Sequence, residues 1–301
     1  MVALVFPGQG SQYVGMARDF HAGSAAAREL CETADRLLGV PLSRICFEGP
    51  EETLRQTEYT QPAIFLHSMI AAAHRQGPAA AMAAGHSLGE YSALVHAGAM
   101  SFEDGLRLVR LRGQLMQRAG EEHRGTMAAV IGLDPEALEA VCARAAAQGV
   151  VQPANYNSPG QVVISGSVEG VHAAMELAKA RGARMVKELV VSGAFHSPLM
   201  ESAREGLRRA LAETPIRDAA IPVYANVTAA PVRTADEIRS LLERQITSPV
   251  RWEETVRAMV RDGAAAFHEV GPGKVLQGLI RRIDPAPAVR GFDTLAECTS
   301  A

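Results

Sequence analysis

The chain has 301 residues, of which 48% are hydrophobic and 21% charged, and its formal net charge is −3 at pH 7. This length is enough for one sizeable hydrophobic core with room for an inserted subdomain. The near-neutral charge argues against nucleic acid as the main partner, because no surplus of basic residues is present to neutralise phosphates.

Cysteine usage and the N-terminal sequence indicate where the protein works. The four cysteines are scattered and form no C-x-x-C pair, a pattern that fits a reducing compartment and gives no metal site. The apolar start, Val2–Phe6, is too short for the core of a signal peptide, and no apolar stretch is long enough to span a bilayer. We therefore expect a soluble, cytoplasmic protein with no membrane partner.

The first predicted element is a buried strand, Val2–Phe6, which ends at Pro7-Gly8. The glycines that follow do not fit the dinucleotide-binding pattern G-x-G-x-x-G, which requires glycine where the chain has Tyr13. A turn that carries Gln9 beside a neighbouring strand end is the better interpretation, because an uncharged amide can stabilise a developing oxyanion. Taken alone, Gln9 is more often an ordinary polar turn residue.

A serine motif follows two predicted helices, Ala25–Leu38 and Gln61–Arg75, which we expect to cover the sheet. Residues 85–89, Gly-His-Ser-Leu-Gly, fit G-x-S-x-G, the turn that holds a nucleophilic serine between a strand and a helix. A helix that begins just after the serine directs backbone N–H groups and a partial positive charge at its oxygen. A plain Gly/Ser turn is the alternative, but the position before a helix start favours Ser87 as a nucleophile.

The next helix, expected over Phe102–Ala119 after a capping pattern, holds the most informative charge. Arg107 and Arg110 have acidic helical neighbours, so we interpret them as a solvated face. Arg112 has apolar neighbours three and four positions away and points towards the core. A structural ion pair or a snorkelling side chain would explain it; beside a serine nucleophile, a fixed arginine also suits a substrate carboxylate held bidentately.

From residue 125 the order of predicted elements becomes β-α-β-β-α-β, the ferredoxin-like split pattern. We therefore expect an inserted small domain over 125–191 and a large catalytic domain made of 1–124 and 192–301. Asn155–Gly160 is interpreted as the central turn of the small domain; a flap of this kind could close over the serine, which spacing alone does not show. The strands are predicted at Thr126–Gly132, Val150–Asn155, Gln161–Ser165 and Ala183–Val191, and the helices at Pro135–Gln148 and Val168–Arg181.

Among nine histidines, His196 has the best context for the general base of Ser87. It lies in a predicted loop, has small neighbours, and precedes a helix that Pro198 starts. A serine–histidine pair usually has a carboxylate that orients the imidazole, and a backbone carbonyl is the alternative that adds no charge. The candidate carboxylates by chain order are Asp104, Asp134, Asp218, Asp236 and Asp262.

The C-terminal part is predicted to contain a strand at Pro222–Val227, a helix at Ala235–Gln245 and a strand at Phe267–Val270. Gly271–Leu276 is interpreted as a strand-to-helix connection rather than a P-loop. The tail beyond residue 283, rich in Pro and Ala, is expected to be poorly ordered.

Taken together, seven motifs in chain order resemble those of the malonyl-CoA:acyl-carrier-protein transacylases, an acyltransferase family shared with polyketide synthases. The resemblance covers residue 5 to about 280 and implies an α/β-hydrolase-like large domain, with a mostly parallel sheet and an inserted ferredoxin-like subdomain. The motifs are Phe6 to Gln12, Gln61 to Ala63, Gly85 to Tyr91, Arg112-Gly113, Asn157 to Gln161, Gly193 to Met200, and Gly271 to Leu276.

The resemblance also implies a reaction in which Ser87 takes malonyl from malonyl-CoA as an ester, with His196 as base and then acid. The phosphopantetheine thiol of acyl carrier protein then accepts the group, which supplies extender units for fatty acid synthesis. No bound cofactor is implied, and we expect a monomer. The remaining implied roles are an oxyanion hole from Gln9 and the backbone N–H of Leu88, a carboxylate clamp from Arg112, orientation of the base by the Gln245 carbonyl, and exclusion of α-methyl groups by Phe195.

Three other functions remain open at this stage. A free-standing polyketide synthase acyltransferase would use the same chemistry on a different carrier. An acyl hydrolase or thioesterase is disfavoured by Arg112, because a carboxylate clamp does nothing for simple fatty esters. A non-catalytic carrier-binding module is disfavoured because the full set of candidate catalytic residues is present.

Overall fold

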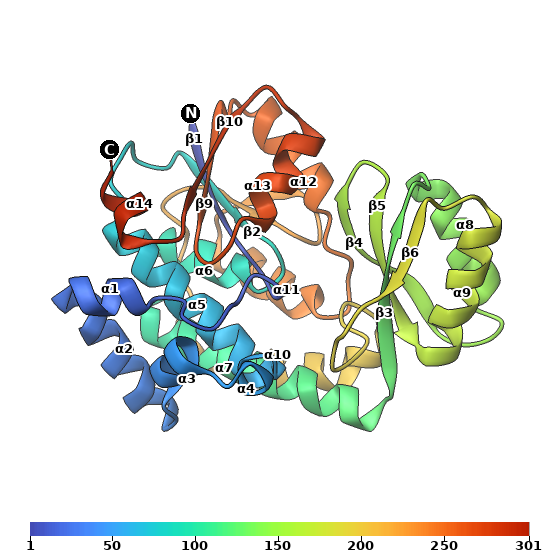
Figure 1. Cartoon of the computed structure of the whole chain (residues 1–301), viewed down its shortest axis with the longest axis horizontal. Coiled ribbons are helices and arrows are strands. Elements are labelled where there is room, and N and C mark those ends of the chain that lie inside the picture. The colour runs from blue at the N-terminus through green and yellow to red at the C-terminus, as the bar shows by residue number, and fades with distance from the viewer. Residues whose placement is uncertain (301) are drawn as a thin grey trace.

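A six-stranded sheet in the order β10-β9-β1-β2-β7-β8 forms the centre of the larger part of the molecule (Figure 1). All its pairs are parallel except that between β7 and β8. The structure is a computed structural model and describes residues 1–300. The strands are β1 (Val2–Phe6), β2 (Met82–Gly85), β7 (Val223–Ala225), β8 (Ala230–Val232), β9 (Ala266–Val270) and β10 (Ala288–Phe292).

Helices cover both faces of this sheet, which explains why β1 is apolar throughout. Leu4 and Phe6 face one core, shared with α5, α6 and α7, while Ala3 and Val5 face the other, shared with α12 and α13. The helices are α1 (Arg18–Gly23), α2 (Ala25–Leu38), α3 (Leu42–Glu48), α4 (Glu51–Leu54), α5 (Thr57–His74), α6 (Gly89–His96), α7 (Phe102–Glu122), α10 (Glu201–Glu213), α11 (Ala235–Gln245), α12 (Trp252–Arg261), α13 (Val275–Ile283) and α14 (Leu295–Thr299).

Helix α5 contains a proline, and its consequence corrects the interpretation of Arg110. Pro62 has no N–H, so the carbonyl of Glu58, one turn earlier, lacks its helical partner. Arg110 Nη1 donates to that carbonyl, while Nη2 lies 2.9 Å from the Glu58 carboxylate. The Arg110 guanidinium also stacks over the Tyr59 ring. Arg110 therefore joins α7 to α5 and is not part of a solvated face, unlike the exposed Arg107.

The second sheet is antiparallel and has the order β4-β5-β3-β6, and Figure 1 shows it with its two helices at one end of the molecule. Both helices pack on one face of the sheet over a separate apolar core. This is the ferredoxin-like arrangement, so the predicted α/β class with two sheets is confirmed. The elements are β3 (Gly125–Ile131), α8 (Pro135–Ala145), β4 (Val151–Ser158), β5 (Gln161–Ser167), α9 (Val168–Ala180) and β6 (Met185–Glu188).

Strand β4 corrects the prediction of a turn over Asn155–Gly160. Residues 155–158 belong to the strand, and only the Pro159-Gly160 pair makes the turn. The polar composition that suggested a loop has another cause: this strand contacts Val250, in the part of the chain that surrounds the six-stranded sheet. The N–H of Tyr156 donates to the carbonyl of Val250, and the N–H of Val250 donates to the carbonyl of Ala154. Backbone hydrogen bonds therefore join β4 to the segment just before α12, which packs on the six-stranded sheet.

Residues 284–300 include a strand and a helix, so the prediction of a poorly ordered tail is wrong for this part of the chain. β10 adds to the sheet by pairing in parallel with β9, and its last residue, Phe292, is buried. α14 then begins with a capping box, in which the Thr294 side chain accepts from the Glu297 N–H and the Glu297 carboxylate accepts from the Thr294 N–H. Within residues 1–300, no helix combines the length and apolarity needed to cross a bilayer.

Candidate active site

Ser87 lies in the tight connection between β2 and α6, with a φ of 51° that side-chain-bearing residues rarely adopt. The glycines on either side are required by close backbone contacts. A Cβ on Gly85 would lie 1.8 Å from the carbonyl carbon of Gly89, and one on Gly89 would lie 2.0 Å from the Phe6 carbonyl oxygen. The G-x-S-x-G pattern therefore has the geometry of a nucleophile turn, with the serine hydroxyl presented at the carboxyl ends of the strands.

His196 lies directly beside this serine. Its Nε2 is 2.8 Å from Ser87 Oγ, and its Nδ1 is 2.9 Å from the carbonyl oxygen of Gln245 and 3.1 Å from that of Ser248. Because carbonyl oxygens only accept, Nδ1 carries the proton and the Nε2 lone pair faces the hydroxyl. The histidine has a φ of 57° and is followed by a 3₁₀ turn, Pro198–Met200, which leads into α10.

No carboxylate orients this imidazole among the hydrogen bonds of residues 1–300, so the backbone-carbonyl alternative is the one that the structure contains. Each candidate aspartate has another partner or lies at the surface. Asp104 bonds Ser101, Asp134 caps α8, Asp218 accepts from Ala235 N–H, Asp236 pairs with Arg239, and Asp262 accepts from Tyr224.

The surroundings keep His196 neutral. Burial lowers its pKa to about 3, and the nearby positive charge of Arg112 acts in the same direction. The carbonyl oxygens on Nδ1 oppose this shift but do not cancel it. A neutral imidazole whose lone pair faces a hydroxyl is the form that a general base needs.

Arg112 is fully buried and has only neutral oxygen partners within the part of the chain that the structure describes. Its Nη1 donates to Gln61 Oε1 at 2.8 Å, and its Nη2 donates to Gln245 Oε1 at 2.9 Å and to Ser87 Oγ at 3.0 Å. The structural ion pair and the snorkelling side chain are therefore both wrong. A buried guanidinium without an anion beside a serine hydroxyl is a site that an anionic group can complete.

Three other predicted site residues, Gln9, Leu88 and Phe195, line a cavity together with Ser87 and His196. Gln9 is exposed, and its amide is 3.5 Å from Thr57 Oγ1 rather than bonded to the serine. The amides of Ser87, Gly89 and Glu90 each have an acceptor, whereas none is found in residues 1–300 for the N–H of Leu88. Phe195, 6% exposed, borders the same hollow.

These residues border a cavity of about 230 Å³ between the two sheets. Residues from the elements around the six-stranded sheet form one side, and the facing side comes from β3, β4, β5 and the segment after β6, including Met127, Asn155, Asn157 and Val163. A second hollow of about 520 Å³ adjoins it and shares Gln9, Leu189 and Val191. Ser87 therefore lines a cavity that lies between the two sheets and adjoins a second hollow. No group of three or more His, Cys, Asp or Glu side chains suited to a metal ion occurs within residues 1–300.

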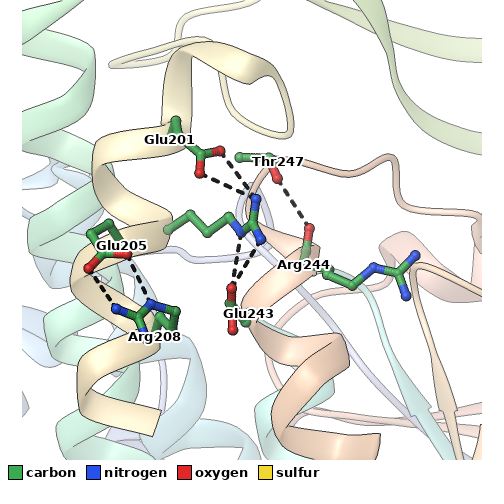
Figure 2. Close-up of polar contacts among 7 residues, drawn as sticks. Glu201, Glu205, Arg208, Glu243, Arg244 and Thr247 are labelled. Atoms are coloured by element: carbon green, nitrogen blue, oxygen red, sulfur yellow. Dashed lines mark hydrogen bonds and ion pairs between the residues drawn. The ribbon is translucent and has the colours of Figure 1, made fainter. Parts of the chain in front are cut away.

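An ionic cluster links α10, which begins shortly after the base His196, to α11, which ends at Gln245. Arg204 of α10 donates to Glu243 of α11 at 3.0 Å and to Glu201 at 3.3 Å. Figure 2 shows Glu201 and Glu243 on the two separate helices. The cluster therefore holds together the two segments whose spacing sets the Nδ1 contact.

Sequence reasoning missed several groups that shape the site. Asn226 accepts from Ser87 N–H at 2.7 Å and donates to the Gly85 carbonyl at 2.7 Å, which clamps the turn. Glu90 accepts from the Gln245 amide, and Gln61 accepts from Arg112. Asn226 directly follows the strand beside β2, and that position at the carboxyl edge was the available signal.

Comparisons with known proteins agree with this geometry. The acyl transferase domain family matches residues 3–286. The malonyl CoA-acyl carrier protein transacylase of Bacillus subtilis (strain 168) is 44% identical over 286 residues, which cover 94% of this chain and 90% of the relative.

Two solved structures extend the likeness to the whole fold. That of the malonyl CoA-acyl carrier protein transacylase from Coxiella burnetii has a TM-score of 0.96 at 40% identity, covering 99% of this chain and 95% of the other. A malonyl-transacylase in complex with a type II PKS acyl-carrier protein also has a TM-score of 0.96 at 40% identity, covering 100% and 98%. The chain belongs to the acyl transferase domain family and, within it, to the malonyl-CoA:acyl-carrier-protein transacylases.

Proposed function

We propose that this protein transfers a malonyl group from malonyl-CoA to the phosphopantetheine thiol of acyl carrier protein, which supplies extender units for fatty acid synthesis. The observation that carries the proposal is the buried guanidinium of Arg112, which forms no ion pair within residues 1–300 and lies 3.0 Å from Ser87 Oγ. A thioester whose acyl group ends in a carboxylate supplies this missing anion. When the carboxylate binds Arg112, the thioester carbonyl of the same short acyl group lies beside Ser87.

In the first half-reaction, Ser87 Oγ attacks the thioester carbonyl while His196 Nε2 takes the hydroxyl proton. The carbonyl oxygen becomes an oxyanion, which we assign to the Leu88 N–H and the Gln9 amide. When the intermediate collapses, the carbon–sulfur bond breaks and the coenzyme A sulfur takes the proton from His196. The product is a malonyl ester on the serine and free coenzyme A.

The second half-reaction reverses these roles. The carrier's phosphopantetheine thiol gives its proton to His196 and attacks the ester carbonyl through the same oxyanion site. The carbon–oxygen bond to Ser87 breaks, and the serine oxygen recovers its proton from the imidazole. The carbonyl oxygen of Gln245 keeps the imidazole in one orientation through both halves.

Arg112 also links substrate binding to the strength of the base. Its positive charge is one reason that the His196 pKa is low. A malonyl carboxylate bound to the guanidinium offsets that charge, so the imidazole becomes a stronger base when the correct substrate is present. Phe195, at the cavity wall, narrows the room beside the α-carbon; such crowding discriminates by only about 1–3 kcal/mol per methyl-sized group.

The test is intact-protein mass spectrometry after brief incubation with malonyl-CoA, for the wild type and Ser87→Ala, followed by a chase with phosphopantetheinylated acyl carrier protein. We expect a malonyl adduct that requires Ser87 and moves to the carrier. An adduct lost to water at the same rate with and without carrier would instead identify a hydrolase. No adduct and no coenzyme A release would exclude malonyl-CoA as donor.

A second candidate is the loading of polyketide synthase carriers by the same chemistry. It is favoured by the 40% identity to a malonyl-transacylase solved with a type II PKS acyl-carrier protein. The chase above, run in parallel with carriers of the two pathways, separates the candidates by their relative kcat/KM values.

We further propose that the protein needs no bound cofactor, since the serine, imidazole, guanidinium and amides supply every group that the reaction uses. The division into 1–124 with 192–301, and 125–191, is supported by the two separate sheets. A cytoplasmic location is supported by four cysteines that are all unpaired and buried. We expect the working form to be a monomer that meets acyl carrier protein at the cavity mouth.

A further inference from the structure

Glu90 is a buried carboxyl group that the reaction above does not use. It follows the serine by three positions on α6 and is only 2% exposed. Burial raises its pKa to about 7, while its hydrogen bonds and the charge of Arg112 oppose this shift, and among the ion pairs within residues 1–300 none includes Glu90. Burying a carboxyl group without a salt bridge costs desolvation free energy, which other contacts must offset.

The contacts of Glu90 are donors that need a fixed acceptor. Its Oε2 accepts from the backbone N–H of Asn226 at 3.0 Å and from the Nε2 of Gln245 at 2.8 Å. The same Nε2 donates to the Ser87 carbonyl at 3.0 Å. Two acceptors thus meet the nitrogen end of the Gln245 amide, which leaves its oxygen end pointing the other way.

That oxygen is one of the three neutral acceptors that hold Arg112, beside Gln61 Oε1 and Ser87 Oγ. Gln245 Oε1 accepts from Arg112 Nη2 at 2.9 Å, and this same Nη2 reaches Ser87 Oγ. If the amide turned over, its NH₂ group would face the guanidinium, donor against donor, and its oxygen would face the Glu90 carboxyl. Only the observed orientation satisfies all three neighbours.

We infer that Glu90 is a positioning residue, which fixes the amide orientation of Gln245 and thereby holds the Arg112 guanidinium where the substrate carboxylate binds. The arrangement keeps a carboxylate off the guanidinium itself. An acidic residue in direct contact would occupy the N–H groups of the Arg112 guanidinium and compete with the substrate carboxylate. The Gln245 amide, which lies between Glu90 and Arg112, positions the arginine without neutralising its charge. This inference rests on the proposed function and assigns a role within it.

The inference predicts a selective loss rather than a general one. Replacing Glu90 with methionine removes the acceptor at similar volume, so the Gln245 amide is free to turn. We expect the kcat/KM for malonyl-CoA to fall about tenfold or more, as for loss of a charge-assisted hydrogen bond, while the kcat/KM for acetyl-CoA changes less than about threefold. Acetyl-CoA has no carboxylate and does not depend on the clamp.

Three further variants make the test specific. Glu90→Gln keeps an acceptor for the Gln245 amide and, unlike Glu90→Met, should retain most of the preference for malonyl-CoA over acetyl-CoA. Gln245→Met removes the relay directly and should lower the malonyl-to-acetyl ratio without any change at Glu90. In the Gln245→Met background, Glu90→Met should have no further effect on that ratio, because the two residues act as one unit.

A control separates this role from general damage to a buried carboxyl group. Glu269 is also buried, and it accepts from the N–H groups of Leu276 and Gln277 at the start of α13. Glu269→Gln should leave the malonyl-to-acetyl ratio unchanged, whatever it does to stability.

The outcomes are distinguishable from failure of the proposed function. A wild type that forms no malonyl adduct overturns the function itself. A wild type that is active, with an unchanged ratio in Gln245→Met, overturns the positioning role even where Glu90→Met does not fold. Equal losses for both donors in Glu90→Met also overturn it, because they indicate a merely structural role.

Discussion

The Nδ1 of His196 lies 2.9 Å from the carbonyl oxygen of Gln245, and this carbonyl occupies the place that an aspartate holds in a Ser-His-Asp triad. A carbonyl fixes the imidazole tautomer as an aspartate does, but it adds no net charge. The absence of that charge suits a site that receives a carboxylate, because an aspartate beside the imidazole would repel it. The positive charge that such a carboxylate needs is supplied by Arg112, whose Nη2 lies 3.0 Å from Ser87 Oγ.

We predict that Arg112→Ala lowers the kcat/KM for malonyl-CoA by about 100-fold or more, since loss of one partner from a buried charged pair costs about 2–5 kcal/mol. The kcat/KM for acetyl-CoA should change far less, so the preference for malonyl collapses. Steady-state kinetics with both donors measure the change. Arg107→Ala, on the exposed face of the same helix, is the matched control and should match the wild type. A retained malonyl preference in Arg112→Ala would disprove the clamp.

The pH dependence of acylation should show no protonation of His196 near neutrality. Its folded-state pKa is lowered to about 3, so the neutral base persists above that value and is lost only as pH falls through it. The first-order rate constant of acylation should therefore not fall between pH 8 and pH 5 through protonation of His196. In Arg112→Gln the removal of a positive charge should raise the pKa of His196, so the fall in rate should begin at a higher pH. An NMR titration of the His196 ring checks both; a wild-type midpoint near 6.5 would contradict the prediction.

The contact between α10 and α11 should matter more for the site than for stability. The Arg204–Glu243 pair is partly exposed, with side-chain accessibilities of 35% and 23%, so a double-mutant cycle in unfolding experiments should give only about 0.5–1 kcal/mol. Because the pair joins the segments carrying His196 and Gln245, we expect Arg204→Ala to lower kcat about threefold with little change in KM.

Arg208 supplies the control for this experiment. It pairs with Glu205 inside α10, as Figure 2 shows, and within residues 1–300 no hydrogen bond or ion pair joins it to α11. Arg208→Ala should leave kcat unchanged. If both arginine variants lower kcat equally, the bridge between the helices has no special part in placing the base.

Local signals were enough for much of the fold. The bounds of α2 were predicted correctly because a Ser24 cap and a left-handed Gly39 mark its two ends in the sequence. The burial of Arg112 followed from its apolar neighbours one turn away. By contrast, β10 was missed because its strand character comes from pairing with β9 rather than from its own residues.

The polar network of the site could not be read from the sequence, for a related reason. Glu90 and Gln245 are 155 residues apart, and Ser87 and Asn226 are 139 apart, so only the folded sheet brings them together. Motifs identify residues whose chemistry shows in their local sequence, such as Ser87. Residues that act by holding another side chain leave no such local pattern.

The turn around Ser87 allows a sharp test of why glycine is present. A Cβ at Gly85 would overlap the backbone of Gly89 and Glu90, so Gly85→Ala forces the start of α6 to move. We expect a loss of at least about 3 kcal/mol in the free energy of unfolding, together with loss of the malonyl adduct. Gly278→Ala is the matched control: its Cβ meets nothing within 4 Å in α13, and alanine should stabilise the helix by about 0.5–1 kcal/mol. Chemical denaturation of the two variants measures both effects, and a Gly85→Ala protein as stable as the wild type would show that the turn relaxes without cost.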